Sequence, residues 1–235
     1  MIGIAITTKD RTKVLQFTIN QFKKYTTEDM CFVVVDDHST ETMLHQIFAN
    51  SIGDYIYNDE NLGVARTKNV CIKYLMSKGC DHIFLFDDDC FPVAENWHLP
   101  WVNSGEHHLN FCIDTHQNII DRKENVIWWD GCLGCCMYFT RECIEKVGGY
   151  DKRYAKYGYE HYELTERIHR AGITPHARMS PIKLGAWSFD AQDSHKLFVW
   201  GRKSCLSKGV KDEGISENLK VHPVVMEDKT IFRDI

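Results

Sequence analysis

The sequence lacks any glycine-rich signature for holding phosphates. Neither Gly-x-Gly-x-x-Gly nor Gly-x4-Gly-Lys-Ser/Thr occurs anywhere in the 235 residues. These absences exclude the dinucleotide-binding fingerprint and the P-loop. A nucleotide bound by this protein must therefore have its phosphates held in another way.

Long apolar runs, low-complexity tracts and internal repeats are also absent. No stretch approaches the roughly 20 apolar residues that span a bilayer, so we expect no transmembrane segment. The first apolar run follows Met1 directly, so we expect neither a signal peptide nor an amino-terminal anchor. With 43% hydrophobic and 12% aromatic residues, the composition is that of one ordinary α/β domain, and two full domains would be a tight fit.

The sequence has neither an excess of positive charge nor a cysteine pattern typical of disulfides or of a zinc site. The net charge of −5 argues against a nucleic-acid partner, because bulk attraction to phosphates needs a positive surface. The ten cysteines stand in apolar runs of a chain too long to need disulfides, so we expect buried thiols and a cytoplasmic location. Cys132-x-x-Cys135-Cys136 has the spacing of one half of a zinc site, but no second Cys or His pair follows at the distance of a zinc finger. We interpret it as small residues in a strand.

Short apolar runs alternate with segments of helical periodicity over the first ninety residues. The pattern predicts strands at residues 2–8, 31–35, 55–57 and 83–86, with helices at 14–22, 42–49 and 67–76 between them. Alternating strands and helices of this length predict an α/β fold with a doubly wound, mostly parallel central sheet and helices on both faces.

Three of the predicted strands end abruptly in polar residues. Because the carboxyl ends of parallel strands meet at one edge of the sheet, we expect these side chains to gather there. Three adjacent carboxylates repel one another, and a divalent cation with oxygen ligands would relieve the repulsion; a solvated acidic turn is the alternative. The set suits a nucleotide whose phosphates are carried by a metal ion, and its members are Thr7, Thr8, Asp36, Asp37, Arg66, Asp87, Asp88 and Asp89.

Four successive segments resemble the nucleotide-sugar motifs of GT-A glycosyltransferases, particularly the broad family 2 group. Each segment alone is a weak signal, but four in the family's order at plausible spacing are a strong one. The segments are Ile6-Thr7-Thr8-Lys9-Asp10-Arg11, Val34-Val35-Asp36-Asp37-His38-Ser39, Asn61-Leu62-Gly63-Val64-Ala65-Arg66-x-x-Asn69 and Asp87-Asp88-Asp89.

The resemblance implies the GT-A (nucleotide-diphospho-sugar transferase) fold and a role for each motif. Asp37 would contact the base, Arg66 the nucleotide and Asp87 the ribose. Asp89 would bind a divalent metal, Mn²⁺ or Mg²⁺, that bridges the diphosphate of the donor. The remaining nucleotide- and donor-binding candidates are Thr7, Thr8, Arg11, Asp36, Asn61, Asp88, Gly134 and Glu163.

The second half of the chain also resembles the family, in the region where donor sugar and acceptor should meet. Residues 134–151 look like the family's small residues, strand and helix that lead to Gly-Gly-Phe/Tyr-Asp, which places Gly134 beside the donor sugar. Glu160-x-x-Glu163-Leu164-x-x-Arg167 resembles Glu-Asp-x-Glu-Leu-x-x-Arg, in which the Asp is the usual catalytic base of inverting members. His161 stands in place of that Asp. Three alternatives follow: His161 is the base, Glu160 takes the proton, or no protein base is needed, as in retaining relatives.

A histidine completes the metal site of several GT-A enzymes about thirty residues beyond this helix start. His195 lies at that distance, in a polar loop, and is the second predicted metal ligand; a histidine without a role is the alternative.

The resemblance also suggests how the chain is divided. We expect residues 1–200 to form one catalytic domain, with a nucleotide-binding half at 1–92 and a donor-sugar and acceptor half at 93–200. Residues 201–235, basic at first, would be either a flap over the donor site or a peripheral extension.

The sequence therefore predicts a metal-dependent, inverting glycosyltransferase that uses a nucleotide-diphosphate sugar, with UDP as the favoured nucleotide. The acceptor is an unidentified hydroxyl group of a saccharide, a protein or another molecule. A nucleotidyltransferase is a rival, but it should have a glycine-rich first loop, and residues 7–11 contain no glycine. A nucleotide-sugar-binding module without activity is the second rival, which His161 keeps open.

Overall fold

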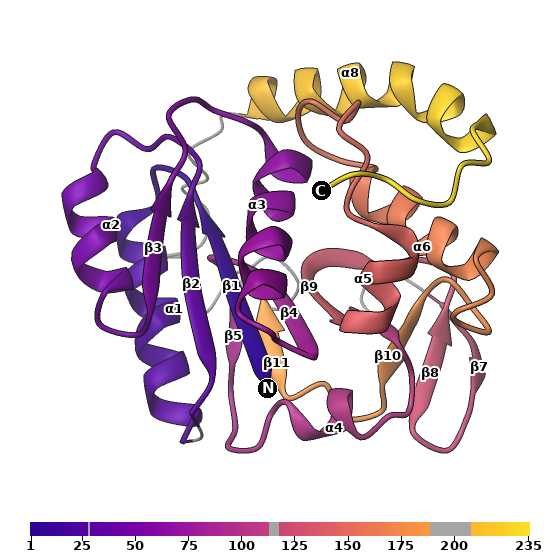
Figure 1. Cartoon of the computed structure of the whole chain (residues 1–235), viewed down its shortest axis with the longest axis horizontal. Helices are drawn as coiled ribbons and strands as arrows, with labels where there is room; N and C mark the ends of the chain where they lie inside the picture. Colours follow the sequence, from indigo (N-terminus) through magenta and orange to yellow (C-terminus); the bar gives the residue numbers. More distant parts are fainter. Residues whose placement is uncertain (28, 113–117, 189–207) are drawn as a thin grey trace.

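A six-stranded sheet forms the centre of the molecule (Figure 1). The computed structural model describes residues 1–27, 29–112, 118–188 and 208–235, and for residues 208–214 the helix backbone alone. The strand order is β3-β2-β1-β4-β9-β6, in which the first four strands are parallel and β9 runs antiparallel to both of its neighbours. The strands are β1 (Ile2–Thr8), β2 (Cys31–Asp36), β3 (Asp54–Tyr57), β4 (His82–Asp87), β6 (His108–Phe111) and β9 (Leu133–Thr140).

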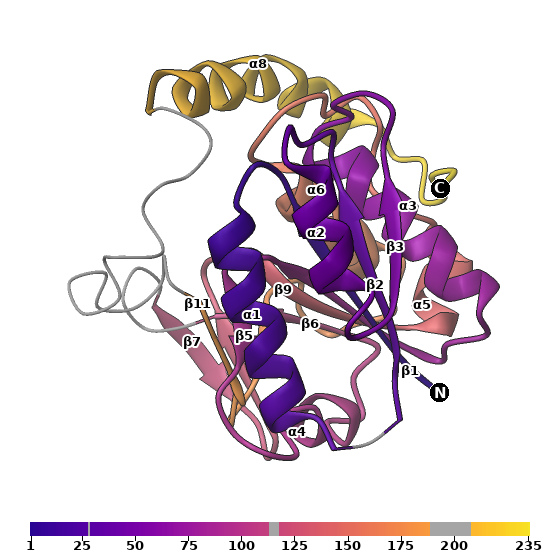
Figure 2. The ribbon, with the colours of Figure 1, turned by 90° about the vertical axis from the view of Figure 1, so that its left-hand side faces the viewer.

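Helices cover both faces of this sheet, as the sequence predicts (Figure 2). Alternate strand residues point to opposite sides: Ile4 and Phe84 pack with α1 on one face, and Ala5 and Leu85 pack with α3 on the other. The helices are α1 (Thr12–Tyr25), α2 (Thr42–Ala49), α3 (Val64–Ser77), α4 (Leu99–Val102), α5 (Arg141–Val147), α6 (Glu160–Arg170) and α8 (Lys208–Glu227).

The first and second halves of the chain share one core. Strands β6 and β9 lie in the same sheet as the nucleotide-binding strands. Trp97 and Trp101 are fully buried beside Phe84 and Phe86. The predicted division after residue 92 therefore does not separate two structural units, and the separate functions of the two halves stay a prediction.

Two small sheets complete the second half. The antiparallel sheet β10-β8-β7 packs beside β6, and β11 pairs with β5. Their bounds are β5 (Cys90–Pro92), β7 (Ile119–Arg122), β8 (Val126–Trp129), β10 (Met179–Pro181) and β11 (Ala186–Ser188).

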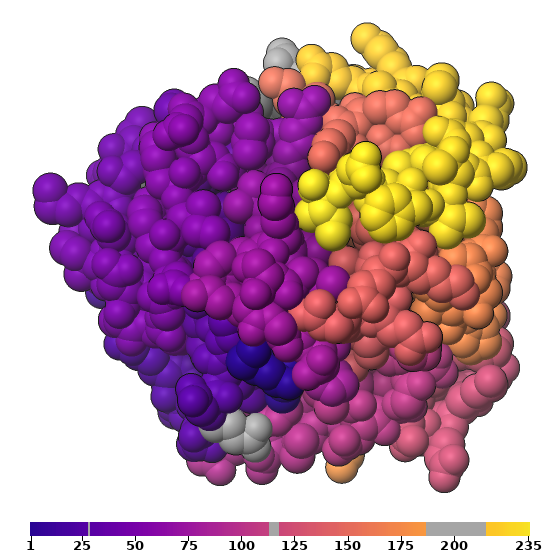
Figure 3. Space-filling view, viewed as in Figure 1, coloured from indigo at the N-terminus to yellow at the C-terminus, as the bar shows by residue number. Residues whose placement is uncertain are grey.

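The described end of the C-terminal extension is bound to the domain. Asn218 Nδ2 donates to the Gly158 carbonyl at 2.8 Å, and Arg233 bridges to Gly148. Figure 3 shows the final segment, in yellow, lying against the surface of the second half. The segment from Asn218 to Arg233 is thus attached to the domain. A flap formed by residues 201–235 stays a prediction, and residues 201–207 lie outside the described ranges. Among the helices that the structure describes, none combines the length and apolarity of a membrane span.

Candidate active site

The polar ends of the central strands meet at one edge of the sheet. Thr7 lies opposite Asp87 in the pairing of β1 with β4, and Thr8 lies opposite Asp36 in the pairing of β1 with β2. The Thr8 hydroxyl donates to Asp88 Oδ2 at 2.6 Å, whereas Thr7 is half-buried and makes only a long 3.4 Å bond to the Phe86 carbonyl. The gathering of these residues that the sequence predicts is therefore present.

Arg11 binds two of the three acidic residues that follow β4. Its Nη1 lies 2.9 Å from Asp88 Oδ1, and its Nη2 lies 2.8 Å from Asp89 Oδ2. Both carboxylates are almost fully buried. Burial raises the pKa of Asp88; the charge of Arg11 opposes this shift, and that of Asp89 adds to it. The structure thus shows that Arg11 neutralises this pair of carboxylates. Its contact with the donor stays a prediction.

Asp87 is the open member of the acidic triplet. Its side chain is 35% exposed, and its Oδ1 lies 2.9 Å from the Nζ of Lys68. Lys68 also donates to the Gly134 carbonyl at 2.6 Å. The sequence motifs did not single out Lys68, although a signal was present: it shares the spacing of Ala65 and Ile72, which form the buried face of α3.

Asp36 and Asp37 stabilise the loops at this edge. Asp36 is fully buried and accepts bonds from His45 Nδ1 at 2.6 Å and Tyr55 Oη at 2.9 Å. Burial alone would raise the pKa of Asp36, but bonds from His45 and Ser39 outweigh it and lower the pKa. Asp36 is thus enclosed by protein partners, and its predicted contact with a donor stays a prediction.

The partners of Asp37 belong to the loop before α3. Its Oδ1 accepts the Leu62 amide at 2.8 Å, and its Oδ2 accepts the Gly63 amide at 3.0 Å. Asn61 is exposed, and its Oδ1 accepts the same Gly63 amide at 3.2 Å. Asp37 thereby fixes the loop in which Asn61 lies, and base recognition by Asp37 stays a prediction.

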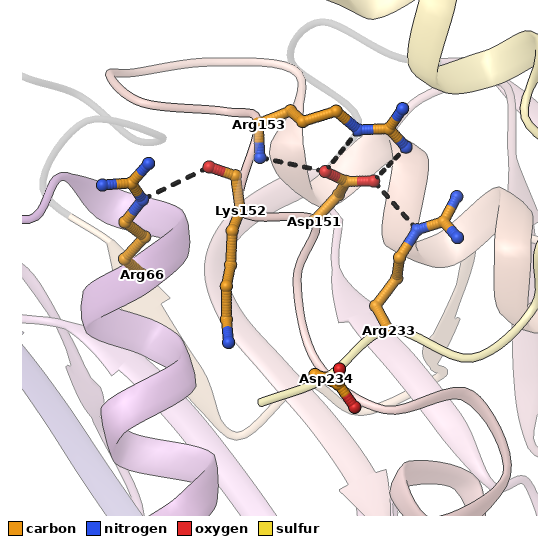
Figure 4. A pocket seen from close by; sticks show the side chains of 6 residues that line it. All are labelled: Arg66, Asp151, Lys152, Arg153, Arg233 and Asp234. Atoms are coloured by element: carbon orange, nitrogen blue, oxygen red, sulfur yellow. Dashed lines mark hydrogen bonds and ion pairs between the residues drawn. The ribbon is translucent and has the colours of Figure 1, made fainter.

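Arg66 lies in a separate hollow of about 570 Å³ (Figure 4). Its Nε donates to the Lys152 carbonyl at 3.2 Å. Deeper in the hollow, Asp151 accepts bonds from Arg153 and Arg233. The structure therefore binds Arg66 to the loop at Lys152, and its contact with a nucleotide stays a prediction.

Glu160 and His161 form a pair at the start of α6. Glu160 is 3% exposed, and its Oε1 lies 3.2 Å from His161 Nδ1. Its Oε2 has no hydrogen-bond partner among the described residues. Burial would raise the pKa of Glu160, but the bond and charge of His161, with the charge of Lys68, outweigh it and lower the pKa. Glu160 is therefore ionised, so His161 Nδ1 carries the proton of their bond.

Gly134 leaves room for the histidine ring. A Cβ atom at Gly134 would lie 3.0 Å from His161 Cγ, closer than side-chain atoms normally approach. The glycine predicted to lie beside the donor sugar thus also leaves space for the ring of His161.

Glu163 is a second carboxylate of the predicted site that is enclosed by protein partners. It is fully buried, and Arg167 donates to both of its oxygens, at 2.8 and 3.2 Å. The same guanidinium donates to the carbonyls of Val147 and Gly149 at 2.5 Å. Glu163 therefore orients Arg167, which fixes the turn after α5, and a contact of Glu163 with the donor stays a prediction.

Within the described ranges, no three His, Cys, Asp or Glu side chains converge as ligands of a metal ion. His195, the second predicted ligand, lies outside those ranges. The oxygen donors at the end of β4 are nevertheless of the kind that Mn²⁺ and Mg²⁺ prefer.

Comparisons with known proteins agree with this geometry. Residues 3–103 match the model for glycosyl transferase family 2, and residues 116–184 match that for the N-terminal domain of galactosyltransferase. An uncharacterised glycosyltransferase of Acanthamoeba polyphaga mimivirus is 28% identical over 194 residues, which cover 74% of this chain and 75% of that protein.

Solved structures show the same fold at low identity. A mannosyltransferase of Pyrobaculum calidifontis, in complex with GDP-Man and Mn²⁺, has a TM-score of 0.56 at 14% identity over 74% of this chain. GalNAc-T7 with UDP, GalNAc and Mn²⁺ has a TM-score of 0.59 at 15% identity over 97% of this chain. S. aureus TarS with UDP has a TM-score of 0.58 at 14% identity over 94% of this chain and 71% of its own. The chain spans 54% of the mannosyltransferase and 56% of GalNAc-T7.

The two family matches cover most of the chain, and the related viral protein is itself described as a glycosyltransferase. The predicted glycosyltransferase class is thus confirmed. The protein is a glycosyltransferase with the GT-A fold, similar to family 2.

Proposed function

We propose that the protein transfers a sugar from a UDP-sugar to a hydroxyl acceptor, with inversion and with the help of a divalent metal ion. Structures of the same fold support a nucleotide-sugar donor, since TarS was solved with UDP-GlcNAc and with UDP, and the mannosyltransferase with GDP-Man. The acceptor, whether saccharide, protein or another hydroxyl compound, is unknown. The cytoplasmic location stays a prediction.

The observation that carries the proposal is the Glu160–His161 pair. Glu160 accepts a hydrogen bond from the Nδ1–H group of His161. This bond fixes the imidazole ring and leaves Nε2 as the basic atom. Nε2 has no bond to a described residue, and the side chain is 15% exposed. Of the three alternatives for the base, this arrangement favours His161, with Glu160 as the residue that orients it.

The reaction then proceeds as a single displacement. Nε2 of His161 takes the proton of the acceptor hydroxyl while its oxygen forms a bond to the anomeric carbon of the sugar. The bond from this carbon to the diphosphate breaks, and the diphosphate leaves with the electron pair. Attack from the side opposite the leaving group inverts the anomeric centre. General base catalysis of this kind contributes roughly 10²–10⁴-fold.

Binding of the donor is assigned to the open edge beside this pair. Asp87 has an exposed carboxylate that can accept from ribose hydroxyls, and Thr7 lies opposite it in the sheet. Asp89 would hold Mn²⁺ or Mg²⁺, and His195 remains the second proposed ligand. When bound, the ion supplies positive charge for the leaving diphosphate.

A thermal-shift screen tests the proposal. UDP, GDP and their sugar conjugates are added with and without Mn²⁺ to the wild type and to Asp89→Ala. We expect one nucleotide family to stabilise the wild type in a metal-dependent manner, by about 2.7 kcal/mol at a ligand concentration of 100 Kd. The ligand-induced shift should be lost in Asp89→Ala and retained in Asp29→Ala, which removes an exposed carboxylate before β2, at the opposite end of that strand. No shift of the wild type with any nucleotide would refute the proposal.

A further inference from the structure

Lys68 is a buried ammonium at the centre of the site that the proposed mechanism does not use. It is 1% exposed, and its Nζ has two close partners: Asp87 Oδ1 at 2.9 Å and the Gly134 carbonyl at 2.6 Å. Through this one atom, α3 is joined to the end of β4 and to the start of β9. These strand ends belong to the nucleotide-binding half and to the donor-sugar half of the chain.

Charged and titratable groups face Lys68 from every side. They are Asp87 from β4, Cys136 from β9, Tyr150 from the turn after α5, Glu160 from α6 and Cys71 from its own helix. Burial acts to lower the pKa of Lys68, but the attraction of Asp87 outweighs it and the pKa is raised. The lysine therefore stays charged within the protein, which a buried ammonium does only when well paired.

The pair that Lys68 makes differs from a purely structural ion pair. In the Glu163–Arg167 pair, both side chains are fully buried. In the Lys68–Asp87 pair, the lysine is enclosed while 35% of the aspartate side chain remains exposed. One end of this pair is thus anchored in the core and the other faces solvent, as a ligand-binding carboxylate requires.

We propose that Lys68 is a positioning residue for the sugar donor. It holds Oδ1 of Asp87, so that the exposed part of the carboxylate faces the donor, and it holds the Gly134 carbonyl, so that the backbone beside His161 keeps its place. This inference rests on the proposed function, because it takes Asp87 as a donor contact. It extends that function by fixing the distance between the nucleotide site and the proton-accepting pair.

Calorimetric titration with UDP and with GDP, in the presence of Mn²⁺, tests the role. Lys68→Met removes the charge at nearly constant volume, Lys68→Arg restores it, and Lys73→Met removes an exposed lysine from the same helix. Charge-assisted bonds of this kind correspond to a roughly 10- to 100-fold effect. We expect Lys68→Met to weaken nucleotide binding by at least the lower figure, Lys68→Arg to recover most of the loss, and Lys73→Met to bind as the wild type does.

A double-mutant cycle with Asp87→Asn separates positioning from general support of the fold. If Lys68 acts through Asp87, Lys68→Met weakens binding far less in the Asp87→Asn background than in the wild type. Lys68→Gln, which can still donate to the Gly134 carbonyl, replaces Lys68→Met if the latter does not fold.

Each outcome of these titrations decides between the two proposals. Unchanged nucleotide affinity in folded Lys68→Met, no recovery in Lys68→Arg, or fully additive losses in the cycle would overturn the positioning role. A wild type that binds neither nucleotide would instead overturn the proposed function itself.

Discussion

At the scale of single residues, His161 is the position where this chain differs from the Glu-Asp-x-Glu-Leu-x-x-Arg motif that it resembles. A carboxylate at this place would be its own base, whereas an imidazole needs a neighbour to fix its proton. Glu160 supplies that neighbour from the preceding position, at 3.2 Å. In the proposed mechanism, Glu160 would fix the proton on Nδ1 of His161, and Nε2 of His161 would accept a proton from the acceptor.

His161→Asn is expected to lower turnover while leaving nucleotide affinity unchanged. The asparagine amide can still donate to Glu160, but no basic nitrogen remains, so UDP release should slow by roughly 10²–10⁴-fold. The measurement pairs initial rates with calorimetric UDP binding, and His169→Asn on the same helix is the control. Turnover at the wild-type level in His161→Asn would show that another group takes the proton.

His108 predicts a pH dependence of stability. It is 1% exposed on β6, and burial lowers its pKa from 6.5 to about 4. Between these two values the unfolded chain binds more protons than the folded one. The free energy of unfolding should therefore fall as the pH drops from about 6.5 to 4, by up to about 3 kcal/mol from this residue.

Urea titrations at pH 7 and pH 4.5 check this prediction. The variant His108→Gln retains a donor for the Tyr138 carbonyl, which His108 Nδ1 contacts at 2.8 Å, but it does not titrate. Its stability should change less between the two pH values than that of the wild type. An equal change in both proteins would assign the acid sensitivity to other groups.

At the scale of elements, the turn after α5 depends on a glycine for two independent reasons. Gly148 has φ +73°, and a Cβ atom there would lie 1.7 Å from the Arg233 carbonyl oxygen of the C-terminal segment. Gly105 has a similar φ of +79°, but a Cβ atom there would meet no atom of the described residues within 4 Å. The two glycines therefore separate backbone strain from steric exclusion.

Gly148→Ala should destabilise the protein much more than Gly105→Ala. The left-handed backbone alone costs about 1 kcal/mol, whereas displacing the C-terminal segment should bring the total at Gly148 to roughly 3 kcal/mol or more. Urea unfolding of both variants gives the comparison. Equal losses would mean that the segment around Arg233 contributes nothing to stability.

The elements themselves were largely predictable from the sequence, because their signals are local. Strand β1 and helix α2 have the predicted bounds, since an apolar run and helical periodicity define them. Helix α3 begins at Val64, three residues before the predicted start, because Asp37 holds the amides of the preceding loop. That bond joins residues 25 positions apart, and no local pattern contains it.

The same limit applies to the site. Motif order correctly predicted that Thr8, Asp36 and Asp87 gather at one edge. It did not reveal which carboxylates are enclosed, because burial of Asp36 and Glu163 depends on partners that periodicity does not identify. Arg11 binds Asp88 and Asp89, and 78 positions of the sequence separate it from Asp89. Such pairs depend on the order of the strands in the sheet, so the sequence alone could not reveal them.

At the scale of the whole molecule, one aromatic cluster ties the second half of the chain to the first. Trp97 packs edge-to-face on Phe22 at 5.7 Å, Phe84 at 5.1 Å and Phe86 at 5.5 Å between ring centroids. These rings come from α1 and β4, whereas Trp97 follows β5. The nucleotide-binding half therefore lacks a complete core without residues of the second half.

Trp97→Ala is therefore expected to destabilise the whole protein in one cooperative step. Truncation of a fully buried tryptophan costs about 3–5 kcal/mol, and because both halves share the cavity that it leaves, neither half should remain folded alone. Urea unfolding followed by far-UV circular dichroism and by tryptophan fluorescence should give coincident transitions at a lower midpoint. Trp128→Ala, at a partly exposed position on β8, should cost less than half as much. Two separated transitions in Trp97→Ala would instead identify residues 1–92 as an independently stable unit, and the site at the end of β4 would then belong to a domain of its own.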